Sequence, residues 1–196
     1  DDRPCCQGLD NGFWARFVPS GRRVIAGIKY VGAGQTHKTC GFGRGVEHIG
    51  EGILLTTRAG DQVDTMTIGW GTIGIQWGKP IFIVFVRASR YTKQLLEANG
   101  AFTVNVPLAQ VDKQIIAVCG TKSGRDMDKI KELDLHLEEP DVISVPGIKE
   151  LPITLECRVV YKQDQNLSYL DEDKRLRYYA PGTANDGDYH TAYYGE

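Results

Sequence analysis

The sequence predicts a mainly β fold with short helices, and three observations support this prediction. Short runs of β-branched and aromatic residues recur along the chain, most clearly at 81–86 and 102–106. Residues 154–161 alternate between apolar and polar side chains, as a half-buried strand does. Glycine and proline mark the corners between these runs, and there is no repeated β-α-β rhythm. A β-barrel with helical insertions fits all three observations.

The same patterns place the elements in order along the chain. Strands are expected at 53–57, 63–68, 81–86, 102–106, 154–161 and from about His190 onward. Short helices are expected at 89–98, 109–118 and 125–133, with one or two helical turns at 171–179. We expect Ser89 to cap the first helix and Asn99-Gly100 to end it. Gly120 is expected to stop the second helix.

The stretch Gly69-Trp70-Gly71-Thr72-Ile73-Gly74 matches the G-x-G-x-x-G pattern of dinucleotide-binding folds. That pattern binds a pyrophosphate only when it opens a helix. Gly78 and Pro80 follow within six residues of Gly74 and interrupt a helical run. We therefore reject the dinucleotide interpretation and expect a glycine-rich loop here, leading into the strand at 81–86.

Composition restricts the class of protein. The chain has 196 residues, 41% hydrophobic and 24% charged, with a formal net charge of -2. These values indicate a globular protein, and they provide no electrostatic surface for nucleic acid or an anionic membrane. No apolar run approaches the ~18 residues that a membrane-spanning helix needs, and the first residues lack a secretory pattern. We therefore expect small-molecule or protein partners and a cytoplasmic location.

The cysteines argue against a metal site and a disulfide framework. The chain has five, which is an odd number, and no C-x-x-C pair; they are Cys5, Cys6, Cys40, Cys119 and Cys157. Residues 1–46 hold three of them, are rich in glycine and contain the basic pair Arg22-Arg23. We expect this region to be an irregular extension, with one strand at 24–31, packed on a domain at 47–196 or on a neighbouring subunit. The alternative is a basic arm for a phosphate-rich partner.

The strongest candidate for a binding site is Arg87-Ala88-Ser89-Arg90-Tyr91-Thr92. It lies where a strand meets the start of a helix, and the unpaired amides of a first helical turn favour an anion. Arginine forks match phosphate geometry, and hydroxyl groups can satisfy the remaining oxygens. The alternative is that Ser89 only caps the helix and the arginines are solvated.

Five ordered blocks resemble the flavin reductase-like family, close to its flavoredoxin branch. The resemblance covers about residues 52–196, and the blocks are 66–70, 81–86, 87–92, 102–106 and 123–129. It implies an FMN-binding split β-barrel that works as a homodimer, with flavin near the subunit interface. It also implies that NADH or NADPH reduces bound FMN, which passes electrons to free flavin, another small-molecule acceptor or a protein acceptor.

The resemblance also implies roles for particular residues. The isoalloxazine ring would lie along Thr65, Met66, Thr67, Ile68, Gly69 and Trp70. The phosphate and ribityl chain would be held by Arg87, Ser89, Arg90, Tyr91 and Thr92. A second loop at the flavin would comprise Cys119, Gly120, Ser123 and Gly124, and His190 would lie on the nicotinamide side.

Some alternatives stay open at this point. The family usually has asparagine where this chain has Asp64, so Asp64 would either face away from the flavin or lower its potential. His190 could be a plain strand residue, and Cys119 either a redox partner of flavin or a buried, inert thiol. An electron carrier without its own nicotinamide site and a non-catalytic flavin-binding protein are the alternative functions.

Overall fold

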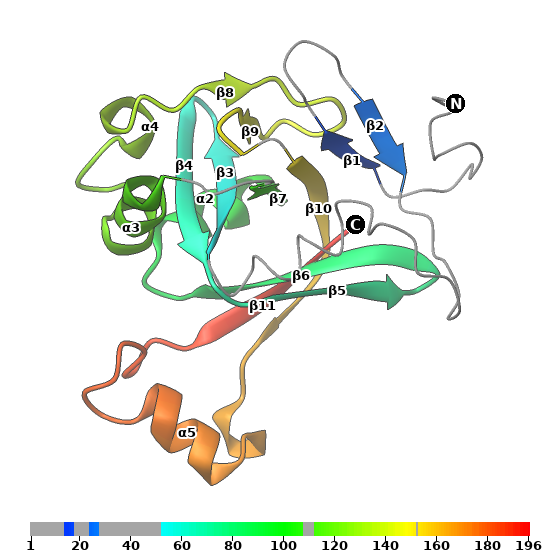
Figure 1. Cartoon of the computed structure of the whole chain (residues 1–196). Coiled ribbons are helices and arrows are strands. Elements are labelled where there is room, and N and C mark those ends of the chain that lie inside the picture. The colour runs from blue at the N-terminus through cyan, green and yellow to red at the C-terminus, as the bar shows by residue number, and fades with distance from the viewer. Residues whose placement is uncertain (1–13, 18–23, 28–51, 108–111, 152) are drawn as a thin grey trace, which may run out of the picture.

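The computed structural model describes residues 14–17, 24–27, 52–107, 112–151 and 153–196 (Figure 1). Among these residues, no helix is long and apolar enough to cross a membrane. The prediction of a mainly β protein with short helices is confirmed, because strands make up most of the regular structure.

A single antiparallel sheet in the order β4-β3-β7-β10-β11-β6-β5 forms the body of the molecule. Its strands are β3 (Ile53–Ala59), β4 (Gln62–Ile68), β5 (Gly71–Gln76), β6 (Lys79–Arg87), β7 (Ala101–Val106), β10 (Ile153–Asp164) and β11 (His190–Gly195). The sheet curls on itself into a barrel, with β6 and β11 crossing below β3 and β4 in the view of Figure 1. β4 is the last strand at one end of this order, which leaves its outer edge without a paired strand in the described part of the chain.

The N-terminal region contributes two of the described strands. β1 (Trp14–Phe17) pairs with β10 and with β2 (Val24–Gly27). The sequence predicted a strand at 24–31, which the structure places at Val24–Gly27, and it missed β1. Most of residues 1–46 lie outside the described residues, so the division into an extension and a domain stays a prediction.

Alternation along the strands separates two apolar clusters. Ile53 and Leu55 of β3 point into the barrel with Met66 and Ile68 of β4, and together with Val84, Phe102 and Val104 they form its core. Leu54 points to the opposite face, where it packs on Ile115 and Cys119. Because successive side chains of a strand alternate between its faces, β3 supports both clusters at once.

The helices differ from the predicted ones at their ends. α2 (Tyr91–Asn99) begins after Arg90, so the expectation that Ser89 is its cap was wrong; Ser89 binds Asp188 instead. Gly100 ends α2 in the left-handed conformation, with φ 71° and its N–H bonded to Leu96, as predicted.

The next two helices are also displaced from the predicted ranges. α3 (Lys113–Thr121) is capped by Asp112, and it continues through Gly120, which was wrongly expected to stop it. Only Lys129–Glu132 is helical (α4) within the predicted 125–133, because the preceding residues form a turn and Asp128 caps the helix.

The glycine-rich segment is a strand and not a loop. Gly71–Gln76 forms β5, which pairs with β6 through a tight turn at Trp77-Gly78, where φ is 53° and 73°. Positive φ at both turn positions matches the twist of a two-residue hairpin. The prediction that no helix follows Gly74 is confirmed, and the prediction of a loop was wrong.

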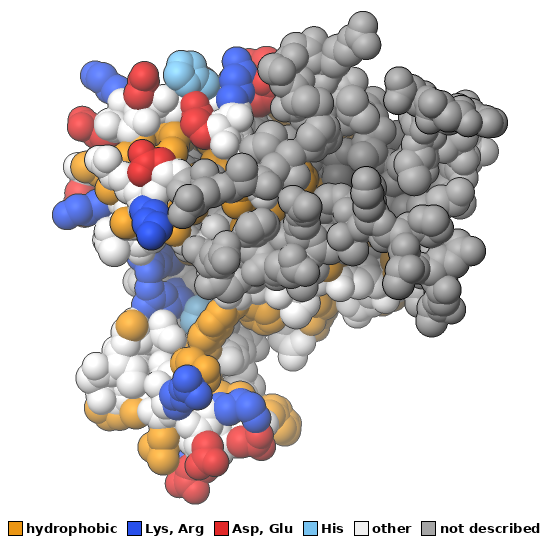
Figure 2. All heavy atoms as spheres, viewed as in Figure 1, with side chains coloured by type: hydrophobic (Ala, Val, Ile, Leu, Met, Phe, Trp, Pro, Cys, Tyr) orange, Lys and Arg blue, Asp and Glu red, His pale blue; other side chains and the backbone are white. Residues whose placement is uncertain are grey.

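Residues 165–189 extend away from the barrel. They include a 3-10 turn (Leu167–Tyr169) and α5 (Glu172–Tyr179), which confirms the predicted helical turns at 171–179. Figures 1 and 2 show α5 as a lobe below the barrel, with apolar and charged side chains on its surface. β8 (Leu137–Glu138) and β9 (Gly147–Ile148) form a small separate sheet.

Candidate functional site

A cavity of about 170 Å³ lies beside β4, between the start of α2, the end of α3 and the segment leading into α4. It is lined by Asp64, Met66, Ser89, Arg90, Tyr91, Thr92, Cys119, Lys122, Ser123, Gly124, Arg125 and Lys129. Strand alternation explains why β4 contributes Asp64 and Met66, which lie two residues apart on one face. We call this the first cavity.

Positive charge dominates the wall of the first cavity. Four of its lining residues are cationic, namely Arg90, Lys122, Arg125 and Lys129, and Asp64 is the one carboxylate among them. The Nε of Arg90 is buried and has no hydrogen-bond partner among the described residues. A buried donor without a partner is costly, and a bound anion would satisfy it. The wall therefore has the charge and the donors for an anion.

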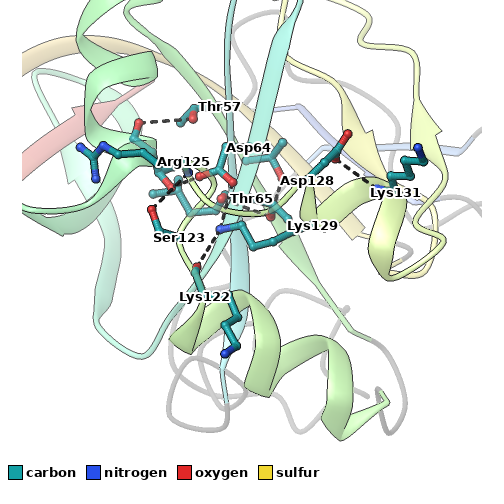
Figure 3. Close-up of polar contacts among 12 residues, drawn as sticks. Thr57, Asp64, Thr65, Lys122, Ser123, Arg125, Asp128, Lys129 and Lys131 are labelled. Atoms are coloured by element: carbon teal, nitrogen blue, oxygen red, sulfur yellow. Dashed lines mark hydrogen bonds and ion pairs between the residues drawn. The ribbon is translucent and has the colours of Figure 1, made fainter.

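The segment 123–125 forms the rim of the cavity (Figure 3). The Ser123 hydroxyl accepts the N–H of Arg125 at 3.2 Å, and the Arg125 guanidinium donates to the carbonyl of Ser89 at 3.0 Å. The same guanidinium lies over the ring of Tyr91 at 5.4 Å. A Cβ on Gly124 would lie 2.4 Å from Asp64 Oδ1, so this close approach requires glycine.

Arg87 and Ser89 are bound to another part of the chain. The N–H and hydroxyl of Ser89 donate to the two carboxylate oxygens of Asp188 at 2.8 and 2.5 Å. Arg87 donates to the carbonyl of Ala184 and lies 3.7 Å from the same carboxylate. Asp188 thus joins the end of β6 to the loop that precedes β11.

A second cavity, of about 360 Å³, lies where β4 runs into β5. It is lined by Gly69, Trp70, Gly71, Thr72, Phe85, Gln165 and Tyr179. The ring of Trp70 lies against that of His190, with centroids 4.8 Å apart and planes inclined by 33°.

His190 begins β11 and is 8% exposed. The hydroxyl of Tyr179 donates to Gln165 Oε1 at 2.7 Å and lies 2.9 Å from His190 Nδ1. Because that hydroxyl has only one proton, it accepts from the Nδ1–H of His190. Burial, together with the nearby charge of Arg87, lowers the pKa of His190 to about 4. His190 is therefore neutral at pH 7, and its Nε2 is the nitrogen that accepts hydrogen bonds.

The structure brings together eight of the fifteen predicted cofactor residues in the first cavity, namely Met66, Ser89, Arg90, Tyr91, Thr92, Cys119, Ser123 and Gly124. Gly69 and Trp70 line the second cavity, beside His190. The side chains of the other predicted residues have different contacts. Thr65 bonds to Thr56 and Leu55, Thr67 bonds to Ile116, Ile68 lies in the core, and Gly120 lies against Thr67.

Sequence reasoning missed several lining residues of both cavities, namely Lys122, Arg125, Lys129, Phe85, Gln165 and Tyr179. Lys129 belongs to the block 123–129, which resembles the flavin reductase-like family. The burial of Lys129 could not be predicted, because the surrounding segment is highly charged. Asp64 lines the first cavity, and the two alternatives for it, facing away from the flavin or lowering its potential, stay predictions. Cys119 is 1% exposed, and burial raises the pKa of its thiol to about 11, so the thiol is protonated at neutral pH.

Comparison with known proteins decides the family. Residues 48–171, more than half of the chain, match the flavin reductase like domain. The chain belongs to this family. An uncharacterized protein of Archaeoglobus fulgidus is 35% identical over 100 residues, which is 51% of this chain and 55% of that protein. The chain thus spans little more than half the length of this relative.

Solved structures of the family share the fold. A flavoredoxin from Methanosarcina acetivorans is 26% identical and has a TM-score of 0.54; the match covers 74% of this chain and 64% of that one. The NADH:FAD oxidoreductase SgcE6 of Streptomyces globisporus C-1027 is 17% identical and has a TM-score of 0.55, with 74% and 71% covered. The predicted flavin reductase-like split-barrel fold is confirmed.

Proposed function

We propose that this protein is an FMN-dependent oxidoreductase. A reduced nicotinamide, NADH or NADPH, would reduce FMN bound to the chain, and the electrons would pass to free flavin or another acceptor. The single observation that supports this most strongly is the cation-lined first cavity in a chain of the flavin reductase like family.

The residues present fit the phosphate group of FMN. The buried Nε of Arg90 has no hydrogen-bond partner among the described residues, and Arg125 and Ser123 lie in the same wall. Charge-assisted bonds from guanidinium to phosphate are among the stronger hydrogen bonds in proteins. The fit is better for Arg90 than for Arg87, because Arg87 does not line the cavity and is bound to Ala184 and Asp188.

β4 provides a route for the ring. Met66 lines the first cavity and Gly69 the second, so β4 runs from one cavity to the other. The outer edge of β4 has no paired strand in the described part of the chain, and its main-chain N–H and C=O groups can bond to the polar edge of a planar ring. Phosphate at Arg90 and ring along β4 would leave the second cavity for the electron donor or acceptor.

When bound, FMN supplies the hydride and electron chemistry, and the chain needs no nucleophile or metal for it. The residues of the chain bind the cofactor, orient it and exclude water. Neutral His190, next to the second cavity, offers Nε2 as a hydrogen-bond acceptor for an amide or another N–H donor.

A second candidate function is an electron carrier of the flavoredoxin type, without a nicotinamide site of its own. The 26% identity with a flavoredoxin favours it. A non-catalytic flavin-binding protein is the third candidate. We further propose a cytoplasmic homodimer with flavin near the subunit interface, in keeping with the exposed Tyr169 and Leu176 on the lobe around α5.

One experiment separates these candidates. The full chain is purified and desalted, its visible spectrum is recorded, and it is then mixed anaerobically with NADH or NADPH. We expect flavin bands that persist after desalting and bleach rapidly with one of the nicotinamides. Persistent bands that a reduced protein donor bleaches and neither nicotinamide bleaches would support the carrier, and bands that no donor bleaches would support the non-catalytic flavin-binding protein. A chain reconstituted with FMN that retains none would contradict flavin binding.

A further inference from the structure

We propose that Asp64 is a built-in counter-ion of the first cavity: it holds Lys129 when no anion is present and lowers the affinity of the cavity for one. This inference rests on the proposed function, because the proposed anion is the phosphate group of FMN. It assigns Asp64 and Lys129 a role in setting the strength of binding, beyond lining the cavity.

The geometry of Asp64 is that of a buried junction (Figure 3). Its Oδ1 lies 2.9 Å from Lys129 Nζ, and its Oδ2 accepts the hydroxyl of Thr92 at 2.6 Å. The side chains of Lys129 and Asp64 are 2% and 3% exposed. One carboxylate therefore connects β4, the second residue of α2 and the first residue of α4.

The pair also supports the rim of the cavity. Lys129 Nζ donates to the carbonyl of Lys122 at 3.4 Å, and Gly124 lies directly against Asp64 Oδ1. Two residues of the segment 122–125 therefore lie against the ion pair, Lys122 at Lys129 and Gly124 at Asp64. A buried ion pair is weak evidence for net stability, but removing one partner leaves an uncompensated buried charge.

The charges in the wall explain why this pair influences binding. Asp64 is the one carboxylate among the described lining residues, which include Arg90, Lys122, Arg125 and Lys129. A phosphate in this cavity is attracted by the cations and repelled by Asp64, and burial reduces the screening of the charges of Asp64 and Lys129 by water. Asp64 and the anion would also share Lys129. An asparagine of the same shape would keep an acceptor for Thr92 and remove the repulsion.

The test compares the full chain with Asp64→Asn, Lys129→Met and the double variant. Inorganic phosphate is titrated into each flavin-free protein, with sodium chloride at equal ionic strength as the reference, and thermal unfolding is followed. Without phosphate, we expect Asp64→Asn to lower Tm by roughly 5–15 °C, because Lys129 is left uncompensated. We expect the same variant to bind phosphate about tenfold more tightly than the parent chain.

The other variants complete the comparison. Lys129→Met should bind phosphate about tenfold more weakly, and adding Asp64→Asn to it should recover both Tm and affinity. The matched control is Asp61→Asn, because Asp61 lies on the exposed turn of the same hairpin. Asp61→Asn should change neither Tm nor the affinity for phosphate. A purely structural role for Asp64 would lower Tm without raising phosphate affinity.

Each outcome decides the inference. Phosphate affinity that is unchanged or weaker in Asp64→Asn would overturn it. If that variant does not fold, the comparison is between Lys129→Met and the double variant, where unchanged or weaker binding in the double variant overturns it equally. Titration with FMN keeps the two proposals apart: tighter phosphate binding without any FMN binding contradicts only the proposed function, whereas FMN binding that Asp64→Asn does not strengthen contradicts only this inference.

Discussion

Arg90 is the residue whose surroundings most directly indicate a ligand. Its Nε is buried without a partner among the described residues, although the residue is only half-buried as a whole. The neighbouring Arg87, which the sequence placed beside it as an equal partner, is bound to Ala184 and Asp188. Arg90 therefore has a donor, unpaired among the described residues, for a phosphate, whereas the guanidinium of Arg87 already contacts Ala184 and Asp188.

We predict that Arg90→Ala weakens FMN binding about 10- to 100-fold, the loss expected for one charge-assisted contact of ~1.5–3 kcal/mol. Fluorescence titration with FMN measures this, and riboflavin affinity should change much less because riboflavin has no phosphate. The matched control is Arg158→Ala, on the exposed side of β10. Equal loss in the two variants would argue against the phosphate contact.

His190 gives a prediction for the dependence of stability on pH. Its folded-state pKa is about 4, below its ordinary value of 6.5, because burial disfavours the charged form. Between these values the unfolded chain binds a proton that the folded chain does not, so stability decreases as the pH falls from 6.5 to 4. The loss from this group amounts to at most about 3 kcal/mol.

Urea unfolding at pH 7 and pH 4.5 measures this contribution. We expect His190→Asn to lose less stability between the two pH values than the parent chain does. If both proteins lose the same amount, His190 titrates normally in the folded protein and the neutral form described above is not enforced by burial.

At the residue scale, the sequence predicted those site residues whose chemistry is local. Residues 87–92 could be identified because arginine and hydroxyl groups at a helix start suggest an anion, whereas Ser123-Gly124 was indicated by the family resemblance alone. The sequence did not show that Asp64, Lys122 and Lys129 line one cavity, because their proximity depends on how α3 and α4 pack against β4. Tyr179 ends α5, Gln165 follows β10 and His190 begins β11, and only the fold brings these three residues together.

At the scale of elements, the position of the segment 122–125 against Asp64 and Tyr91 requires a glycine at 124. We predict that Gly124→Ala weakens FMN binding at least about tenfold, because the added methyl group would meet Asp64 at 2.4 Å and Tyr91 at 2.7 Å and displace the segment. Gly74→Ala is the control, since no atom lies within 4 Å of the corresponding methyl position. The same FMN titration applies, and equal affinity for the Gly124→Ala variant and the parent would contradict the role of this segment.

The Asp188 contact joins β6 to the loop before β11. We predict that Asp188→Asn increases amide hydrogen exchange at Ser89 about tenfold or more, because that N–H loses a charged acceptor at 2.8 Å. Asp173→Asn, a change at an exposed residue of α5, is the control. Unchanged protection at Ser89 would show that the carboxylate does not hold this loop.

Most elements could be predicted from the sequence, but their ends could not. The alternation at 154–161 indicated β10, and the short runs at 53–57 and 63–68 indicated β3 and β4, because strands have a local sequence pattern. The glycines at 69–74 concealed β5, since a strand at the end of a sheet with exposed side chains lacks that pattern. α3 and α4 begin where Asp112 and Asp128 cap them, and apolar spacing does not reveal a cap.

At the scale of the whole molecule, the barrel places two cavities along one strand. β4 follows β3 as a hairpin, yet it lies at the end of the sheet order, so no strand among the described residues pairs with its outer edge. The pairing of β3 with β7 and of β10 with β11 determines this order, and neither pairing is local in the sequence. Family resemblance therefore predicted the split barrel where periodicity alone predicted only a β-barrel.

The central claim is that the first cavity holds the phosphate group of a flavin whose ring lies along β4. The most direct measurement is titration of the flavin-free full chain with FMN and with riboflavin, at one ionic strength. We predict that FMN binds at least about a hundredfold more tightly than riboflavin, since two or more charge-assisted phosphate contacts distinguish them. Equal affinity for the two flavins, or binding of neither, would contradict the claim.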